Sequence, residues 1–106
     1  MSDIEITPQE VDQMRKSGTD FVLIDVREPW EYDTARIEGS TLIPMRQVPQ
    51  RASEIPAGKP VVVHCHHGGR SLQVVRWLRQ NGVEARNLTG GIDRWALEID
   101  PNVPRY

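Results

Sequence analysis

The chain has 106 residues, 38% of them hydrophobic and 26% charged, which is the composition of one compact globular domain and is too short for two ordinary ones. Its net charge of -2 at pH 7 provides no general attraction to nucleic acid or to anionic membranes, so we expect neither as a partner. No stretch approaches the ~20 apolar residues of a membrane span, and residues 1–5 lack the basic and apolar regions of a signal peptide, so we expect a cytoplasmic protein.

The first half of the chain alternates helix and strand signals. Thr7-Pro8-Gln9-Glu10 forms a capping box with proline at the first helical position, which predicts a helix that ends near Gly18. The continuous apolar run 21–26 predicts a strand buried on both faces of a parallel sheet. Three short elements are expected next: a helix from Pro29, a strand over 41–44 and a helix over 48–55.

The second half continues the alternation. Val61-Val62-Val63-His64 is the strongest strand signal and predicts the centre of the sheet. A helix from Ser71 to Asn81-Gly82, a strand over 83–88 and a helix over 92–99 follow. We therefore expect an α/β fold with a mainly parallel central sheet and helices on both faces. A single domain should span residues 1–106, with a proline-rich tail at about 100–106.

Cys65, the only cysteine of the chain, lies where a strand leads into a helix. Open α/β sheets place their sites at the carboxyl ends of strands, where helix N-termini present unpaired N–H groups. Gly68 and Gly69 permit a short loop whose N–H groups turn toward one sulfur, and Arg70 adds a positive charge. These surroundings favour a negative sulfur, would stabilise a persulfide anion and would attract an anionic donor. The pattern predicts a nucleophilic cysteine that needs no neighbouring base.

Three other interpretations of this segment compete. A buried cysteine most often serves only as a small apolar side chain in the core. Such a packing role does not require two glycines, an arginine and a helix start directly after the cysteine. Residues 64–67 are all potential metal ligands, but adjacent residues at a strand end point in different directions while zinc ligands converge. A cysteine-histidine hydrolase needs a base across a cleft, and every histidine here adjoins Cys65. We expect no metal and no cofactor, with His66 and His67 lining the loop mouth to hold an anionic substrate or to face solvent.

Three sequence blocks resemble the rhodanese superfamily, and together they span nearly the whole chain. Residues 24–32 are similar to its first signature, 65–71 to its active-site loop, and 88–95 to its closing Gly-Gly and tryptophan helix. One segment departs from the pattern, since Ala35-Arg36-Ile37 stands where Gly-His-Ile is usual. The related cysteine phosphatases have one residue more between cysteine and arginine than this chain has between Cys65 and Arg70, so the resemblance implies sulfur transfer.

The resemblance also implies roles for the loop residues. Cys65 would attack the outer sulfur of a donor such as thiosulfate, release sulfite, and pass the sulfur from its persulfide to a thiol or to cyanide. Arg70 would orient the anionic donor. The residues that would bind substrate and persulfide, largely through backbone N–H groups, are His66, His67, Gly68, Gly69 and Ser71.

Two charged residues near the end of the first long strand are expected to support the site. By the resemblance, the Asp25 carboxylate could pair with the Arg70 guanidinium. The alternative for Asp25 and Arg27 is an ion pair with a structural role only. The tail 100–106 is similar to the end of rhodanese domains fused to adenylating enzymes, although a proline-rich strap lying over the domain is the interpretation we favour.

The sequence thus favours a sulfurtransferase enzyme with a small anionic donor and a thiol or cyanide acceptor. A sulfur relay, which receives sulfur from one partner and delivers it to a sulfur-accepting protein, fits the same residues. A regulatory binding module is disfavoured because inactive relatives usually lack the cysteine. A phosphatase or arsenate reductase is disfavoured by the short loop.

Overall fold

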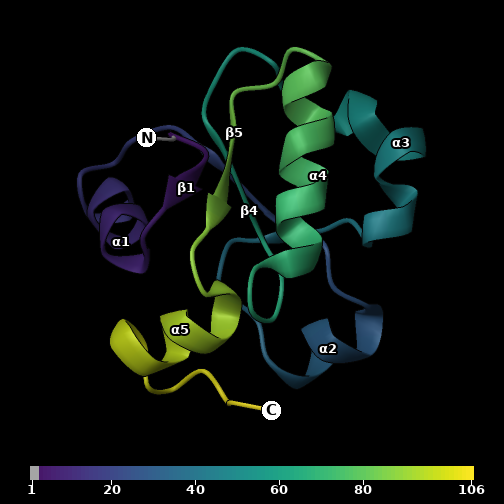
Figure 1. Cartoon of the computed structure of the whole chain (residues 1–106). Coiled ribbons are helices and arrows are strands. Elements are labelled where there is room, and N and C mark those ends of the chain that lie inside the picture. The colour runs from purple at the N-terminus through teal and green to yellow at the C-terminus, as the bar shows by residue number, and fades with distance from the viewer. Residues whose placement is uncertain (1–2) are drawn as a thin grey trace.

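The computed structural model describes residues 3–106 of the chain. The expectation that residues 1–5 hold no signal peptide therefore falls partly on residues 1 and 2, outside the described residues. Five strands form one sheet in the order β1-β5-β4-β2-β3, and every neighbouring pair is parallel (Figure 1). The strands are β1 (Glu5–Ile6), β2 (Val22–Asp25), β3 (Thr41–Leu42), β4 (Val61–His64) and β5 (Ala85–Leu88).

Strand β4 lies at the centre of the sheet, as predicted. It pairs with β2 on one side and with β5 on the other, and all four of its residues are buried. Three consecutive valines suit this position, because β-branched side chains pack well on both faces of a pleated sheet. The strand ends at His64, so the residue that follows it, Cys65, leaves the carboxyl end of the sheet at its middle.

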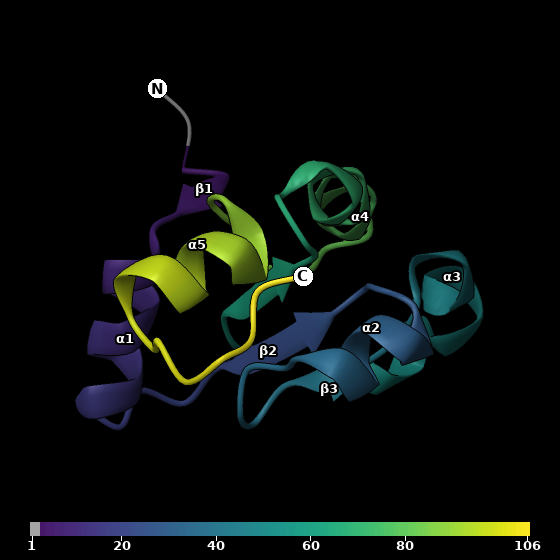
Figure 2. The ribbon, with the colours of Figure 1, turned by 90° about the horizontal axis from the view of Figure 1, so that it is seen from below.

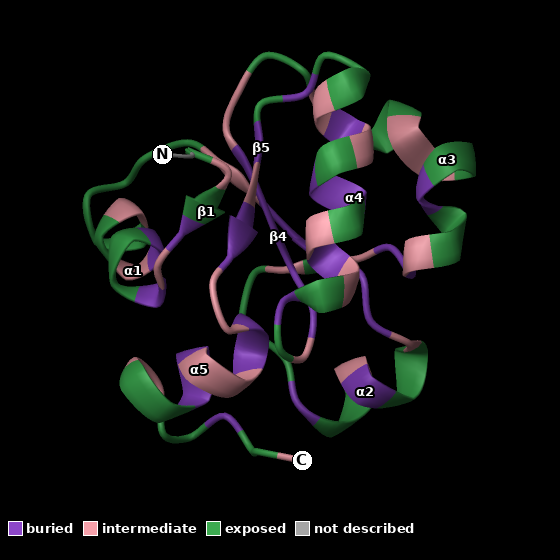
Figure 3. Ribbon diagram, viewed as in Figure 1, coloured by how far each residue is buried: buried purple, intermediate pink, exposed green. Residues whose placement is uncertain are grey.

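Helices cover both faces of the sheet (Figure 2), which confirms the predicted α/β class. Alternate strand residues divide between two cores: Val61 and Val63 contribute to the one under α3 and α4, whereas Val62 contributes to the one under α1 and α5. In Figure 3 the helix surfaces turned toward the sheet are buried and the outer ones exposed. The helices are α1 (Pro8–Lys16), α2 (Pro29–Thr34), α3 (Val48–Arg51), α4 (Gly69–Gln80) and α5 (Gly91–Glu98).

Helix α1 begins with the predicted capping box. The Thr7 hydroxyl accepts from the backbone N–H of Glu10 at 3.1 Å, and the Glu10 carboxylate accepts from the N–H of Thr7 at 2.9 Å. Two orphan donors at the helix start are satisfied in this way.

Two elements differ most from the sequence expectation, while the strands expected over 41–44 and 83–88 are only shorter, at Thr41–Leu42 and Ala85–Leu88. Strand β1 was not predicted, because two residues give no periodic signal, and it forms only by pairing with β5. The helix expected over 48–55 divides into α3 and a 3-10 turn over Ala52–Glu54, after which Ile55 is extended. Pro56 follows, and a residue before proline is driven out of the helical conformation. Over residues 3–106, no helix has the length and apolar character needed to cross a membrane.

Candidate active site

Cys65 starts the loop between β4 and α4, and it is 1% exposed. The loop turns sharply at Gly68, whose φ of +114° is a conformation that other residues rarely adopt. Helix α4 then begins at Gly69. The Cys65 side chain is thereby placed at the N-terminus of a twelve-residue helix, at the carboxyl edge of the sheet.

Three hydrogen-bond donors surround the Cys65 Sγ atom. The N–H groups of Gly68 and Ser71 donate to it at 3.1 and 3.4 Å, and the Ser71 hydroxyl donates at 3.3 Å. Of the N–H groups from His66 to Ser71 that the sequence predicts at this place, those of Gly68 and Ser71 make the contact. Donors aimed at one sulfur, together with the helix N-terminus, stabilise negative charge on it.

Asn87 on β5 ties this loop to the neighbouring strand. Its side-chain Oδ1 accepts from the Ser71 hydroxyl in a short hydrogen bond, and its Nδ2 donates to the Gly68 carbonyl at 3.2 Å. The Ser71 hydroxyl has one proton, so Asn87 and the Cys65 sulfur share it. Sequence reasoning missed Asn87; the signal available was an asparagine, a residue depleted in strands, just before Leu88 at the end of the strand expected over 83–88.

The start of α5 supports the loop from the other side. The N–H groups of Ile92 and Asp93 donate to the carbonyls of Cys65 and His66 at 2.9 and 3.1 Å. Gly91 directly precedes Ile92 and has a φ of +62°, and a Cβ atom there would lie 2.5 Å from the Cys65 carbonyl oxygen. The second glycine of the Gly90-Gly91 turn is therefore required for this close approach.

Arg70 pairs with Glu31 on α2, which corrects the expected contact with Asp25. Arg70 Nη1 and Nη2 donate to the two carboxylate oxygens of Glu31 at 2.7 and 3.0 Å. The Arg70 guanidinium lowers the pKa of Glu31 to about 2, so this carboxylate is ionised at neutral pH. Sequence spacing could not have identified Glu31, because its place depends on how α2 lies against the loop.

Asp25 instead forms a fully buried ion pair with Arg27. Arg27 Nη2 lies 2.6 Å from Asp25 Oδ2, and both side chains are 0% exposed. Arg27 also donates to the carbonyls of Ala35 and Glu31 at 2.6 and 3.3 Å. The pair thus holds the end of β2 against the first turn and the C-cap of α2, and so fixes the position from which Glu31 reaches Arg70.

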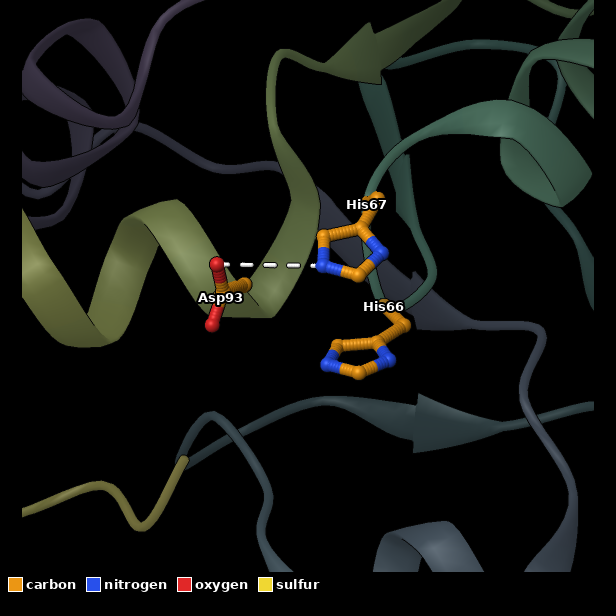
Figure 4. A group of neighbouring side chains, drawn as sticks. All are labelled: His66, His67 and Asp93. Carbon is orange, nitrogen blue, oxygen red and sulfur yellow. Dashed lines mark ion pairs between the residues drawn. The ribbon is translucent and has the colours of Figure 1, made fainter. Parts of the chain in front are cut away.

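His66 and His67 lie at the mouth of the loop, near Asp93 of α5 (Figure 4). One ligand atom from each of the three lies within 4.8 Å of the others, which is a possible metal cluster among the described residues. Contrary to the sequence argument, the two adjacent imidazoles do not point apart but stack with centroids 4.0 Å apart. An imidazole nitrogen binds a metal in the plane of its ring, and in two stacked rings these directions run side by side and do not converge on one ion. The Asp93 carboxylate is also occupied, because Arg105 donates to it at 2.9 Å. We assign no metal to this cluster.

Comparisons with known proteins agree with this geometry. A family model described as "Rhodanese-like domain" matches residues 7–98. A protein of Allochromatium vinosum named "Sulfurtransferase" is 38% identical over 93 residues, which are 87% of each protein. The "Probable adenylyltransferase/sulfurtransferase MoeZ" of Mycobacterium tuberculosis is 34% identical over 104 residues, which are 95% of this chain but 26% of that protein.

Solved structures show the same fold. The crystal structure of a rhodanese-related protein from Thermoplasma volcanium matches with a TM-score of 0.84 and 29% sequence identity, covering 96% of this chain and 98% of that one. Family model, relatives and fold all lead to one assignment: the chain belongs to the rhodanese-like family of sulfurtransferases.

Proposed function

We propose that the protein moves sulfane sulfur from thiosulfate or a persulfide donor, through a persulfide on Cys65, to a thiol acceptor or to cyanide. The observation that carries this proposal is the set of donors from Gly68 and Ser71 that converge on the Cys65 sulfur. The two sulfurtransferase relatives support the same reaction class.

The transfer proceeds in two balanced displacements. The Cys65 thiolate attacks the outer sulfur of thiosulfate, a new S–S bond forms, and the old S–S bond breaks with its electron pair leaving on sulfite. The acceptor thiolate or cyanide then attacks the terminal sulfur of the persulfide, and the Cys65 thiolate leaves. The protein returns to its starting state without a cofactor.

The loop residues have two roles, since some stabilise negative charge and others form the surface that the donor contacts. The N–H groups of Gly68 and Ser71 stabilise the leaving Cys65 thiolate, and the same donors face the persulfide whose charge lies one atom further out. Arg70 orients the anionic donor, with its guanidinium already oriented by Glu31. His66 and His67, at the mouth, and Gly69, at the helix start, complete the surface that a donor meets.

A sulfur relay is the second candidate. In this case Cys65 receives sulfur from one protein and delivers it to another, with little turnover of thiosulfate. The match to a protein whose name joins adenylyltransferase and sulfurtransferase favours this version, since two such activities in one chain imply a protein that both activates and sulfurates an acceptor. We place either reaction in the cytoplasm, where a free thiol stays reduced.

Thiocyanate formation from thiosulfate and cyanide tests the proposal. The wild-type protein should produce thiocyanate, and Cys65→Ser should abolish production because a hydroxyl forms no persulfide. Ser40→Ala, which removes a hydroxyl bonded to Ile37 away from the loop, is the matched control and should leave the rate unchanged. Full activity in Cys65→Ser would refute the proposal. Turnover with a small persulfide donor but not with thiosulfate would favour the relay.

A further inference from the structure

The segment 99–106 after α5 crosses the carboxyl edge of the sheet toward α2 (Figures 1 and 2). Val103 anchors it in the core with α1 and α5, at 8% exposure. Arg105 pairs with Asp93 at 2.9 Å. Together these contacts deliver the side chain of Tyr106 to the mouth of the Cys65 loop.

The ring of Tyr106 stacks on the imidazole of His66, the first residue after Cys65. Their centroids lie 4.0 Å apart and the planes differ by 10°. Trp30 of α2 meets the same tyrosine ring edge-on, with centroids 5.9 Å apart. These ring contacts place the phenol between the active-site loop and α2, and they do not involve its hydroxyl.

The hydroxyl of Tyr106 joins two charged groups that the site uses. It accepts a hydrogen bond from Arg27 Nη1 at 2.7 Å and donates one to Glu31 Oε2 at 2.7 Å. Burial raises the pKa of Tyr106 to about 12, so the phenol keeps the proton that it donates.

The Glu31 carboxylate is fully used by the donors around it. Its Oε1 accepts from the Glu28 N–H at 2.9 Å and from Arg70, and its Oε2 accepts from Arg70 and from Tyr106. Arg70 and Tyr106 therefore share one oxygen. A carboxylate with every donor in place has one orientation, and that orientation fixes the guanidinium of Arg70.

We propose that Tyr106 is a positioning residue of the Cys65 site, whose hydroxyl holds Glu31 so that Arg70 stays aimed at the donor. The effect of Tyr106 on sulfur transfer rests on the proposed function. The arrangement of Arg70 beside Cys65 can be measured without that reaction. A strap with a structural role only would need the ring of Tyr106 but not its hydroxyl.

Alkylation of Cys65 by a charged and a neutral reagent measures this positioning. Iodoacetate is an anion that a well-placed Arg70 attracts, whereas iodoacetamide is neutral, so the ratio of the two rates reports Arg70. In Tyr106→Phe the rings still stack and the hydrogen bond to Glu31 is lost. We expect the iodoacetate to iodoacetamide ratio to fall about threefold, the lower range for one hydrogen bond. Tyr32→Phe, which removes the only other tyrosine hydroxyl, should leave the ratio unchanged.

A double-mutant cycle tests whether the effect of Tyr106 on Arg70 passes through Glu31. If Tyr106 acts through Glu31, adding Tyr106→Phe to Glu31→Gln should change the ratio no further. A parallel series with thiosulfate should show a higher KM in Tyr106→Phe with kcat little changed. The inference is overturned if Tyr106→Phe keeps the wild-type alkylation ratio, or lowers it equally with and without Glu31→Gln. Because alkylation needs no sulfur transfer, failure of the proposed function would leave this test intact.

Discussion

At the residue scale, the chemistry of the site depends on what surrounds one sulfur. Cys65 alone has the burial of a filler, at 1% exposure, and it is the converging donors from Gly68 and Ser71 that distinguish it. These donors could be predicted from the sequence, because the glycines, Arg70 and the helix start all follow closely after Cys65. The contacts of Asn87 and Glu31 with the loop could not be recognised in this way, because each residue reaches the loop from an element far away in the chain.

His64, directly before Cys65, predicts how stability depends on pH. Neither ring nitrogen has a hydrogen-bond partner, and burial lowers the pKa of His64 to about 4. An unfolded histidine takes up a proton near pH 6.5, so the folded state loses stability as pH falls from 6.5 toward 4. Urea unfolding at a series of pH values should show this loss in the wild type.

The matched variant for this prediction is His64→Leu, which fills the site with an apolar side chain of similar size. Its free energy of unfolding should fall less than that of the wild type between pH 6.5 and 4. Parallel pH profiles for the two proteins would show that His64 does not account for the loss.

At the element scale, the helix α2 is placed by polar contacts more than by packing. It has six residues, and one of them, Glu31, is buried. The Asp25–Arg27 pair holds it through the carbonyls of Ala35 and Glu31. From the sequence, Asp25 was expected to pair with Arg70, with a structural Asp25–Arg27 ion pair as the alternative, and the structure shows the alternative. Sequence carries no information on which guanidinium faces the carboxylate.

Arg27→Met tests this role of the pair. Removing one partner leaves the Asp25 carboxylate buried and uncompensated, which should lower the free energy of unfolding by about 3–5 kcal/mol. Lys59→Met, which breaks the exposed ion pair with Asp20 at 3.1 Å, is the control and should cost less than about 1 kcal/mol. Chemical denaturation of both variants measures the difference, and equal losses would contradict a structural role for the Asp25–Arg27 pair.

At the scale of the whole molecule, parallel strands bring distant segments to one edge. The carboxyl ends of β2, β4 and β5 supply Asp25, Cys65 and the Gly90-Gly91 turn. The sequence predicts that these ends lie at one edge, because its alternating strands and helices indicate a parallel sheet. The path of segment 99–106 could not be predicted from the sequence in the same way. Tyr106 reaches Arg27 across 79 positions of sequence, and no local pattern encodes such a contact.

The persulfide on Cys65 is the central claim, and intact mass spectrometry tests it most directly. After incubation with thiosulfate and removal of small molecules, the wild-type protein should gain one sulfur, about 32 Da, which cyanide then removes. Cys65→Ser should gain nothing. If the wild type takes up no sulfur from thiosulfate or from a small persulfide, or if Cys65→Ser takes up as much, the persulfide account is contradicted.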